Sequence, residues 1–198
     1  MAMPGIADAK LAPGFADPGR DSQRVFRAAL AAMAEPGRIA TLDLRLQPTP
    51  PLGLAQSALA LTLLDFEVAL WLDGPVAPAA DYLRFHTGVR LAARPEDADY
   101  CLIAGPLPPL SSFKAGSEEE PEAGATLIVA VAGLLGDGPW RLKGPGLPHE
   151  GRLGVGGLPA DFAAQWAQNQ RAFPRGIDLF LCAGSRLVGL PRTLTIEG

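Results

Sequence analysis

The sequence predicts an α/β domain with three layers (α/β/α), in which a mostly parallel or mixed central sheet lies between helices. Three apolar runs, DYCLIAG, ATLIVAVAG and IDLFLCAG, are continuous instead of alternating, which is typical of central strands covered on both faces. Segments with helical spacing of apolar residues separate these strand-like runs along most of the chain. With 198 residues and no repeat or linker, we expect a single domain over residues 1–198, with residues 1–16 as a loosely ordered lead-in.

The first helix is predicted between Asp17 and Gly37. Asp17 is a suitable N-cap, Pro18 suits the first helical position, and Pro36 with Gly37 ends the helix. The apolar residues that recur at helical spacing, and should form its buried face, are Val25, Phe26, Ala29, Leu30 and Met33. Residues 38–46 (RIATLDLRL) then alternate and predict a strand.

The middle of the chain predicts a second helix, a short strand and a third helix. Residues 54–65 are apolar almost all round, so this helix should be buried on most sides. The segment EVALWLD predicts a strand that ends at Asp73-Gly74, and residues 77–85 predict a helix. This helix runs into LRFHTG (residues 83–88), which contains one of only two histidines.

The last third of the chain supplies further strands and one more helix. WRLKGPG and RLGVGG predict short strands, and residues 158–173 predict a helix that ends at Pro174. After the third buried strand, SRLVGLPRTLTIE predicts one or two closing strands. Because these are punctuated by Pro and Gly, we expect them to add antiparallel members at an edge.

Composition excludes several classes of function. The formal net charge is -4 and there is no basic stripe, so no nucleic-acid partner is expected. Residues 52–64, the most apolar stretch, are too short to cross a bilayer, and the N-terminus lacks a secretory signal pattern. A cytoplasmic protein without a membrane partner is expected. Cys101 and Cys182 lie in apolar runs without CxxC spacing, which predicts buried free thiols.

Three short motifs have simpler structural interpretations. GVGGLPADF lies between a strand and a helix but lacks the third glycine and the later acidic residue of a dinucleotide site. SSFK (residues 111–114) has serine–lysine spacing in a Pro-rich loop, outside the context of a nucleophile pair. SEEEPE predicts a solvated loop in preference to a weak cation site, and no metal site is predicted from the His and Cys spacing.

Arginine usage indicates a possible anion site. The chain has 14 Arg but three Lys, and Arg84, Arg175 and Arg192 lie in LRFHTG, FPRGID and LPRTLT. The planar guanidinium suits phosphate or carboxylate. The alternatives are that these residues pair with acidic side chains, for example Asp178 or Asp65, and that the excess of Arg over Lys reflects genomic composition. His86 can be a general base, but no nucleophile can be named for it, so a hydrogen-bonded structural residue is the alternative.

Seven segments in the same order carry a resemblance to a known family. They are FADPGRDSQRVFRAALAAMAEPGRI, LALTLLDFEVALWLD, YLRFHTG, GSEEEPEAGATLI, GLPADF, FPRGIDLFL and LPRTLTI. Together they resemble the PhnH family, the H subunit of the bacterial carbon–phosphorus lyase system that degrades phosphonates. The resemblance extends from Phe15 to about Ile196.

The resemblance implies a fold similar to that of pyridoxal-phosphate-dependent transferases but without the cofactor's lysine, so no cofactor is expected. It implies a homodimer and a core complex with the G, I and J subunits, which joins a phosphonate to the ribose of a nucleoside triphosphate. It also implies a required, non-catalytic subunit of this alpha-D-ribose 1-methylphosphonate 5-triphosphate synthase. Anchors of a homodimer interface could come from Trp71, Trp140 and Trp166, each of which could equally be core.

The alternative is a phosphonate- or nucleotide-binding or catalytic subunit with its own anion site. The candidate anion-binding or interface residues for either role are Arg84, His86, Glu119, Arg175 and Arg192. Arginine at such a site would hold the phosphonate or triphosphate, and His86 would move a proton.

Overall fold

The computed structural model describes residues 12–198, and its centre is a seven-stranded sheet in the order β1-β9-β8-β5-β4-β2-β3. The strands are β1 (Ala40–Thr41), β2 (Ala69–Leu72), β3 (Arg90–Leu91), β4 (Tyr100–Ile103), β5 (Thr126–Ala130), β8 (Asp178–Ala183) and β9 (Arg186–Leu190). Neighbours from β3 to β8 are parallel, whereas β9 and β1 are antiparallel to their neighbours. The prediction of a mixed, mostly parallel sheet is confirmed, and the three continuous apolar runs are its adjacent strands β4, β5 and β8.

A second, three-stranded antiparallel sheet has the order β10-β6-β7. Its strands are β6 (Gly133–Lys143), β7 (Gly151–Gly156) and β10 (Thr195–Glu197). The closing segment was predicted to add antiparallel strands at an edge of the main sheet. β9 is antiparallel but lies between β1 and β8, one strand in from the edge, and β10 joins the second sheet. The chain turns between β9 and β10, where the Leu194 amide donates to the carbonyl of Pro191 (2.8 Å), and Pro191 itself has no amide hydrogen for a ladder.

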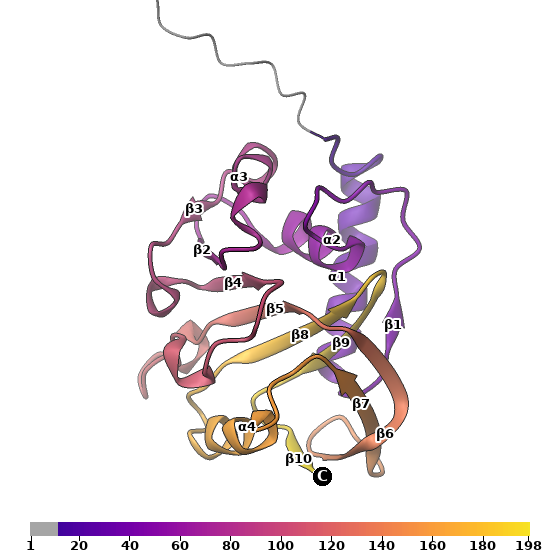
Figure 1. Ribbon diagram of the computed structural model, residues 1–198, viewed down its shortest axis with the longest axis vertical. Coiled ribbons are helices and arrows are strands. Elements are labelled where there is room, and N and C mark those ends of the chain that lie inside the picture. Colours follow the sequence, from indigo (N-terminus) through magenta and orange to yellow (C-terminus); the bar gives the residue numbers. More distant parts are fainter. Residues whose placement is uncertain (1–11) are drawn as a thin grey trace, which may run out of the picture.

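The outer layers are helical on one face of the main sheet and mixed on the other (Figure 1). The helices α1 (Pro18–Ala34), α2 (Leu54–Leu63) and α3 (Ala80–Thr87) form the first layer. The helix α4 (Phe162–Arg171) and the three-stranded sheet form the second. The predicted α/β/α arrangement is therefore correct for one outer layer only, because much of the other is a sheet.

Two hydrophobic cores lie on opposite faces of the main sheet, and alternate side chains of the central strands point into one core or the other. On β5, Ile128 belongs to the core beneath α1–α3, while Leu127 and Val129 belong to the core beneath α4 and the small sheet. On β8, Phe180 and Leu181 divide in the same way. This double burial explains why these runs are continuous and do not alternate.

Helix α1 is capped as predicted but is rotated relative to its predicted buried face. The Asp17 carboxylate accepts a hydrogen bond from the Arg20 amide at 3.1 Å. Val25, Ala29 and Ala32 are buried, whereas Phe26 and Leu30 are 47% and 55% exposed. Small side chains let α1 approach β9 closely: a methyl group added to Gly189 would lie 2.6 Å from the Ala32 carbonyl oxygen.

The predicted strand at residues 38–46 shortens to β1, Ala40–Thr41. Leu42 and Leu46 are buried, so the alternation does mark inward-facing side chains. The Leu42 amide still donates to the Ser185 carbonyl (2.9 Å), but β9 begins at Arg186 and offers no partner further on. Without a neighbouring ladder, the rest of the segment runs as irregular chain over the helical layer.

The remaining helices are close to their predictions. The predicted helix at residues 77–85 forms as a 3-10 turn, Ala77–Ala79, followed by α3, which ends at Gly88 in the left-handed region (φ 73°). The other 3-10 segments are Pro95–Asp97, Leu110–Ser112 and Pro121–Ala123. None of the helices within residues 12–198 has the length and apolarity to span a membrane.

Candidate functional site

His86, at the end of α3, holds the start of the described chain against the helical layer. Its Nε2 lies 3.0 Å from the carbonyl oxygen of Ala12, to which a protonated Nε2 donates. Its ring centroid lies 4.6 Å from that of Tyr82 and 5.0 Å from that of Phe85. A methyl group added to Gly14 would lie 3.1 Å from Nδ1. These contacts are those of a hydrogen-bonded, packed histidine, and they place Ala12 and Gly14 against α3.

Arg84, two residues earlier, is exposed on the surface of α3. Its Nη1 lies 3.9 Å from Asp81 Oδ1, and the two side chains are 61% and 88% exposed. A pair of this length and exposure contributes little to stability. The guanidinium therefore remains accessible to an anion or to a partner protein.

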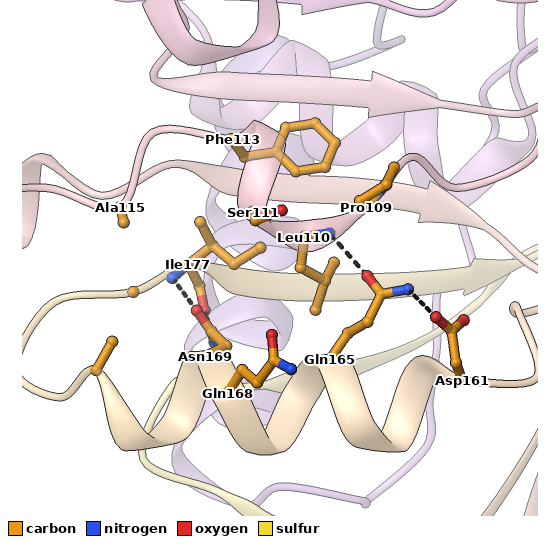
Figure 2. A pocket seen from close by; sticks show the side chains of 12 residues that line it. Pro109, Leu110, Ser111, Phe113, Ala115, Asp161, Gln165, Gln168, Asn169 and Ile177 are labelled. Atoms are coloured by element: carbon orange, nitrogen blue, oxygen red, sulfur yellow. Dashed lines mark hydrogen bonds between the residues drawn. The ribbon is translucent and has the colours of Figure 1, made fainter.

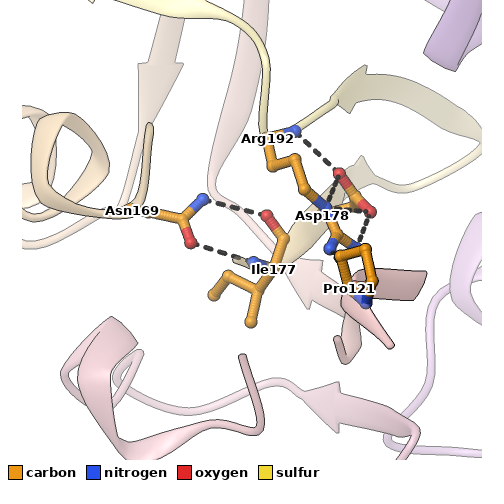
Figure 3. A network of polar contacts seen from close by, with 5 residues as sticks. All are labelled: Pro121, Asn169, Ile177, Asp178 and Arg192. Atoms are coloured by element: carbon orange, nitrogen blue, oxygen red, sulfur yellow. Dashed lines mark hydrogen bonds and ion pairs between the residues drawn. The ribbon is translucent and has the colours of Figure 1, made fainter. Parts of the chain in front are cut away.

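Arg192 pairs with Asp178 (Figure 3). This agrees with the alternative prediction that these arginines bind acidic side chains of the chain itself. Its Nη2 and Nε donate to Asp178 Oδ2 at 2.6 and 3.1 Å, and its backbone amide donates to Oδ1 at 2.7 Å. Nη1 donates to the Pro121 carbonyl at 2.6 Å. The side chains of Arg192 and Asp178 are only 13% and 23% exposed. One guanidinium thus joins the β9–β10 turn, the start of β8 and the end of the acidic loop.

The side-chain amide of Asn169, on α4, makes two hydrogen bonds with the backbone of Ile177, the residue just before β8. Its Nδ2 donates to the Ile177 carbonyl and its Oδ1 accepts from the Ile177 amide, both at 2.9 Å (Figure 3). The Gly176 amide donates to the Ala115 carbonyl at 2.8 Å. Gly176 has φ +137°, and a methyl group there would lie 2.8 Å from Asn169 Oδ1. Arg175, exposed beside Gly176, therefore projects from a fixed segment.

The structure brings Arg192 and the segments that carry Arg175 and Glu119 to one corner. Gly124 packs so closely against Gly176 and Arg192 that a methyl group on it would overlap the Gly176 carbonyl oxygen. This places Arg192, the segment of Arg175 and the loop that carries the exposed Glu119 together. Arg84 and His86 lie on α3, and no hydrogen bond or ion pair among residues 12–198 joins them to this corner.

A cavity of about 530 Å³ opens beside this corner, between the 3-10 segment Leu110–Ser112, α4 and Ile177 (Figure 2). Its floor is apolar, with Leu110, Phe113 and Ile177. Small-molecule sites typically have about 300–1,000 Å³ and a mostly apolar lining with a few polar groups. By size and lining, this hollow is the candidate small-molecule site.

Carboxamides from one face of α4 supply the polar groups of the cavity (Figure 2). Gln165 accepts from the Leu110 amide (2.8 Å) and donates to Asp161 (2.9 Å), which ties the loop to the helix. Gln168 points toward the hollow in Figure 2 and makes no hydrogen bond with any residue in 12–198, so its amide can bind a ligand. Sequence reasoning missed this site, although Gln165, Gln168 and Asn169 share helical spacing.

The serine–lysine motif does not form a nucleophile pair in the described chain. Lys114 Nζ binds Asp99 Oδ1 at 2.8 Å, and Ser111 makes no hydrogen bond to Lys114. Partial burial raises the pKa of the Asp99 carboxyl, but hydrogen bonds from Lys114 and from the Ala69 amide outweigh it and leave that pKa below its usual value. Asp99 and Lys114 therefore act as a charged link between the start of β4 and the loop.

The glycine-rich turn before α4 borders a second hollow, of about 680 Å³, at the carboxyl ends of β4 and β5. Open α/β sheets bind ligands outside the carboxyl ends of their strands, at the switch point where the connections from two adjacent strands run in opposite directions along the sheet. Here the switch point lies between β2 and β4. The buried carboxylate of Asp73, which follows β2, joins the two strand ends there. Asp73 accepts from the amides of Ala104 (2.9 Å) and Gly105 (2.6 Å). Sequence reasoning missed this role.

Residues 12–198 form neither a metal site nor a reactive thiol site. No three His, Cys, Asp or Glu side chains gather there as ligands of a metal ion. Cys101 and Cys182 are buried free thiols, as predicted. Burial, followed by the charge of Asp99, raises the pKa of Cys101 to about 12, and burial also raises the pKa of Cys182.

Comparison with known proteins gives one consistent result. The family model described as bacterial phosphonate metabolism protein (PhnH) matches residues 13–197. The chain is 36% identical over 187 residues to the alpha-D-ribose 1-methylphosphonate 5-triphosphate synthase subunit PhnH of Rhizobium meliloti (strain 1021), covering 92% of this chain and 94% of that protein. It is 37% identical over 179 residues to HtxG of Stutzerimonas stutzeri, named as a candidate C-P lyase subunit protein, covering 88% and 85% of the two chains.

Proposed function

This chain belongs to the PhnH family of bacterial phosphonate metabolism proteins, and we propose that it serves as the PhnH subunit of alpha-D-ribose 1-methylphosphonate 5-triphosphate synthase. One observation carries the proposal: the family match begins before α1 and ends in β10, so it includes every element of both sheets. The relative in Rhizobium meliloti is matched over nearly its whole length as well.

We propose that the chain acts as a required, non-catalytic subunit that forms a homodimer and binds the G, I and J subunits. The exposed arginines and aromatic side chains of the helical layer, such as Arg84, Phe26 and Phe85, support a role in assembly, because Arg and aromatic residues are enriched at interfaces. Of the three tryptophans, Trp166 is fully buried, and Trp140 stacks on Phe162 with ring centroids 5.4 Å apart. Trp71 is partly exposed near the β3 edge of the sheet.

Co-expression tests this assignment directly. The chain is produced together with tagged G, I and J subunits, and we expect it to be retained with the tag through gel filtration in a fixed ratio. Growth on methylphosphonate as sole phosphorus source should stop when the gene is deleted and return when it is supplied. A chain that never enters the complex, or is dispensable for growth, overturns the proposal.

We further propose that the fold is of the type found in pyridoxal-phosphate-dependent transferases and that the chain holds no such cofactor. Lys114 and Lys143 are engaged in ion pairs, with Asp99 at 2.8 Å and with Glu150 and Glu197 at 3.1 and 3.0 Å. Lys10 lies outside the described residues. After incubation with pyridoxal phosphate and removal of the excess, the protein should lack the visible absorbance of an internal aldimine.

The cavity beside α4 favours a second candidate function, the binding of a phosphonate or nucleotide by this chain. The free amide of Gln168 would contact the ligand, and Arg175, next to the lining residue Gly176, would contact its anionic group. Millimolar ATP or methylphosphonate should then raise the melting temperature of the protein. Gln168→Ala and Arg175→Ala should each reduce the shift, whereas Arg84→Ala should leave it unchanged. No shift with either compound contradicts this candidate.

A further inference from the structure

An open groove of about 290 Å³ lies between α1, the end of α2 and the amino ends of β4, β5 and β8. From α1 it is lined by Phe26, Ala29, Leu30 and Met33, and from α2 by Leu63. We call this hollow the α1 groove. It lies on the helical side of the main sheet, whereas the cavity beside α4 lies on the other side.

The floor of the α1 groove is a row of three oxygen-bearing side chains. Tyr100, Thr126 and Asp178 are direct partners across β4, β5 and β8, so their side chains stand side by side. Asp178 is neutralised by Arg192. The hydroxyls of Tyr100 and Thr126 make no hydrogen bond with residues 12–198, which leaves them open to a partner's polar groups.

The α1 wall presents large apolar surface to solvent. Phe26 and Leu30 are 47% and 55% exposed and are spaced by one helical turn. Single exposed apolar residues are ordinary, but here two of them border a groove that Met33 and Leu63 also line. Apolar pockets of this kind take up the anchor side chains of a partner protein.

Positive charge lies on the same helix, outside the lining of the groove. Arg20, Arg24 and Arg27 follow one another at helical spacing along the exposed side of α1. Within residues 12–198, Arg20 and Arg27 make no ion pair, whereas Arg24 donates to the Asp43 carbonyl at 3.0 Å and approaches Asp21 at 4.0 Å. A partner that covers the groove must therefore place its own groups near unneutralised guanidinium charge.

We infer that the α1 groove is the docking site for a different subunit of the synthase, which inserts an apolar helix face between Phe26 and Leu63 and sets carboxylates against Arg20 and Arg27. The inference rests on the proposed function of the chain as a complex subunit. The apolar face supplies affinity, and the carboxylates supply orientation and a faster encounter.

Charge argues against a second copy of this chain as the occupant. Two copies of α1 that meet across a two-fold axis through Phe26 and Leu30 would bring Arg27 close to its own copy. Like charges placed together at an interface disfavour association. A partner with carboxylates beside its apolar face removes this penalty.

The first experiment measures co-purification of the chain with the tagged partner subunits. Leu30→Glu places a charge in the groove, and the matched control is Leu135→Glu, because Leu135 is also largely exposed (66%) but lies on β6, outside the groove. We expect the wild type and the control to be retained equally and Leu30→Glu to be retained at least tenfold less. Equal melting temperatures for the two variants establish that both are folded.

The second experiment measures affinity as a function of salt. Arg27→Glu should weaken binding at least fivefold at low salt, and wild-type affinity should fall as ionic strength rises. The control is Arg141→Glu, which alters an exposed arginine of β6 that has no ion pair in the described chain. Equal loss in Arg27→Glu and Arg141→Glu would show that the charge near the groove has no specific role and would overturn the inference.

The possible outcomes distinguish a failure of this inference from a failure of the proposed function on which it rests. If the wild type fails to bind the other subunits, the proposed function itself is wrong. If the wild type binds and Leu30→Glu binds equally well, the groove is not the docking site although the chain is a subunit. If Leu30→Glu turns a dimer into a monomer that still binds the other subunits, the occupant is a second copy and the inference is overturned.

Discussion

The Arg192 guanidinium lies 2.6 Å from the Asp178 carboxylate, at the first residue of β8, and both side chains are largely shielded from solvent. The adjacent residue, Ile177, is held by Asn169 of α4. Ile177 lines the cavity on one side of the sheet, and Asp178 lines the α1 groove on the other. These two polar contacts therefore fix the one strand end that borders both candidate binding surfaces.

Arg192→Ala should destabilise the protein strongly. Removing one member of a fully buried ion pair costs about 3–5 kcal/mol, and the residual exposure of this pair reduces the expected cost to about 2–3 kcal/mol. Urea denaturation measures the free energy of unfolding. Arg84→Ala is the control, since its pair with Asp81 is exposed and 3.9 Å long, and it should change stability by less than about 0.5 kcal/mol. Similar effects of the two substitutions would contradict the structural role of Arg192.

Asn169→Ala should cost about 1–3 kcal/mol, because it removes both hydrogen bonds to the backbone of Ile177. Gln168→Ala is a matched control one residue away on the same helix, since that amide has no hydrogen bond in the described chain and its loss should be nearly neutral. Denaturant midpoints of the two variants give the comparison. Since Ala is the better helix former at both positions, equal destabilisation by Gln168→Ala and Asn169→Ala would contradict the role of the link to Ile177.

The Asp99 carboxylate should make stability depend on acid. Since its pKa is lower in the folded protein than in the unfolded chain, its stabilising contribution is complete above the unfolded value of about 3.9. That contribution is lost as the pH falls through the lower folded value. Unfolding measured between about pH 2 and pH 6 should show a shallower acid slope for Asp99→Asn than for the wild type. Identical slopes would show that the ion pair with Lys114 does not form in solution.

The two thiols should resist modification while the protein is folded. Cys101 and Cys182 are buried and their pKa values are raised, so at about pH 8 almost no reactive thiolate is present. Ellman's reagent should label both cysteines promptly in guanidinium chloride and label native protein only at the rate of unfolding. Fast labelling of native protein would show that one of these strands opens locally.

Local patterns predicted most of the elements because the periodicity of apolar residues depends on which faces a segment buries. The continuous runs of β4, β5 and β8 are apolar on both faces, and the structure places a core on each side of them. The Asp17 cap and the buried α2 follow from residue types that act within a few positions of the chain. The order of short motifs from Phe15 to Ile196 likewise predicted the family that the comparison confirmed.

Local patterns failed where the answer depended on a distant partner. Alternation predicted a nine-residue strand at residues 38–46, but β9 offers a ladder only to its first part. The apolar stripe of α1 included Phe26 and Leu30, but the close approach of Ala32 to Gly189 turns that side toward solvent. In both cases the neighbour that decides the outcome lies more than 100 positions away in sequence.

The sequence by itself determined the α/β class, the central strands, most helices and the family, since these follow from burial patterns and from ordered motifs. Only the tertiary structure decided that Arg192 is neutralised by Asp178, that His86 binds Ala12, and that carboxamides of α4 line a cavity. The physical reason is that the charge state and accessibility of a side chain depend on groups brought near it by folding. For Arg192 these groups lie 14 and 71 positions away, where no local pattern reveals them.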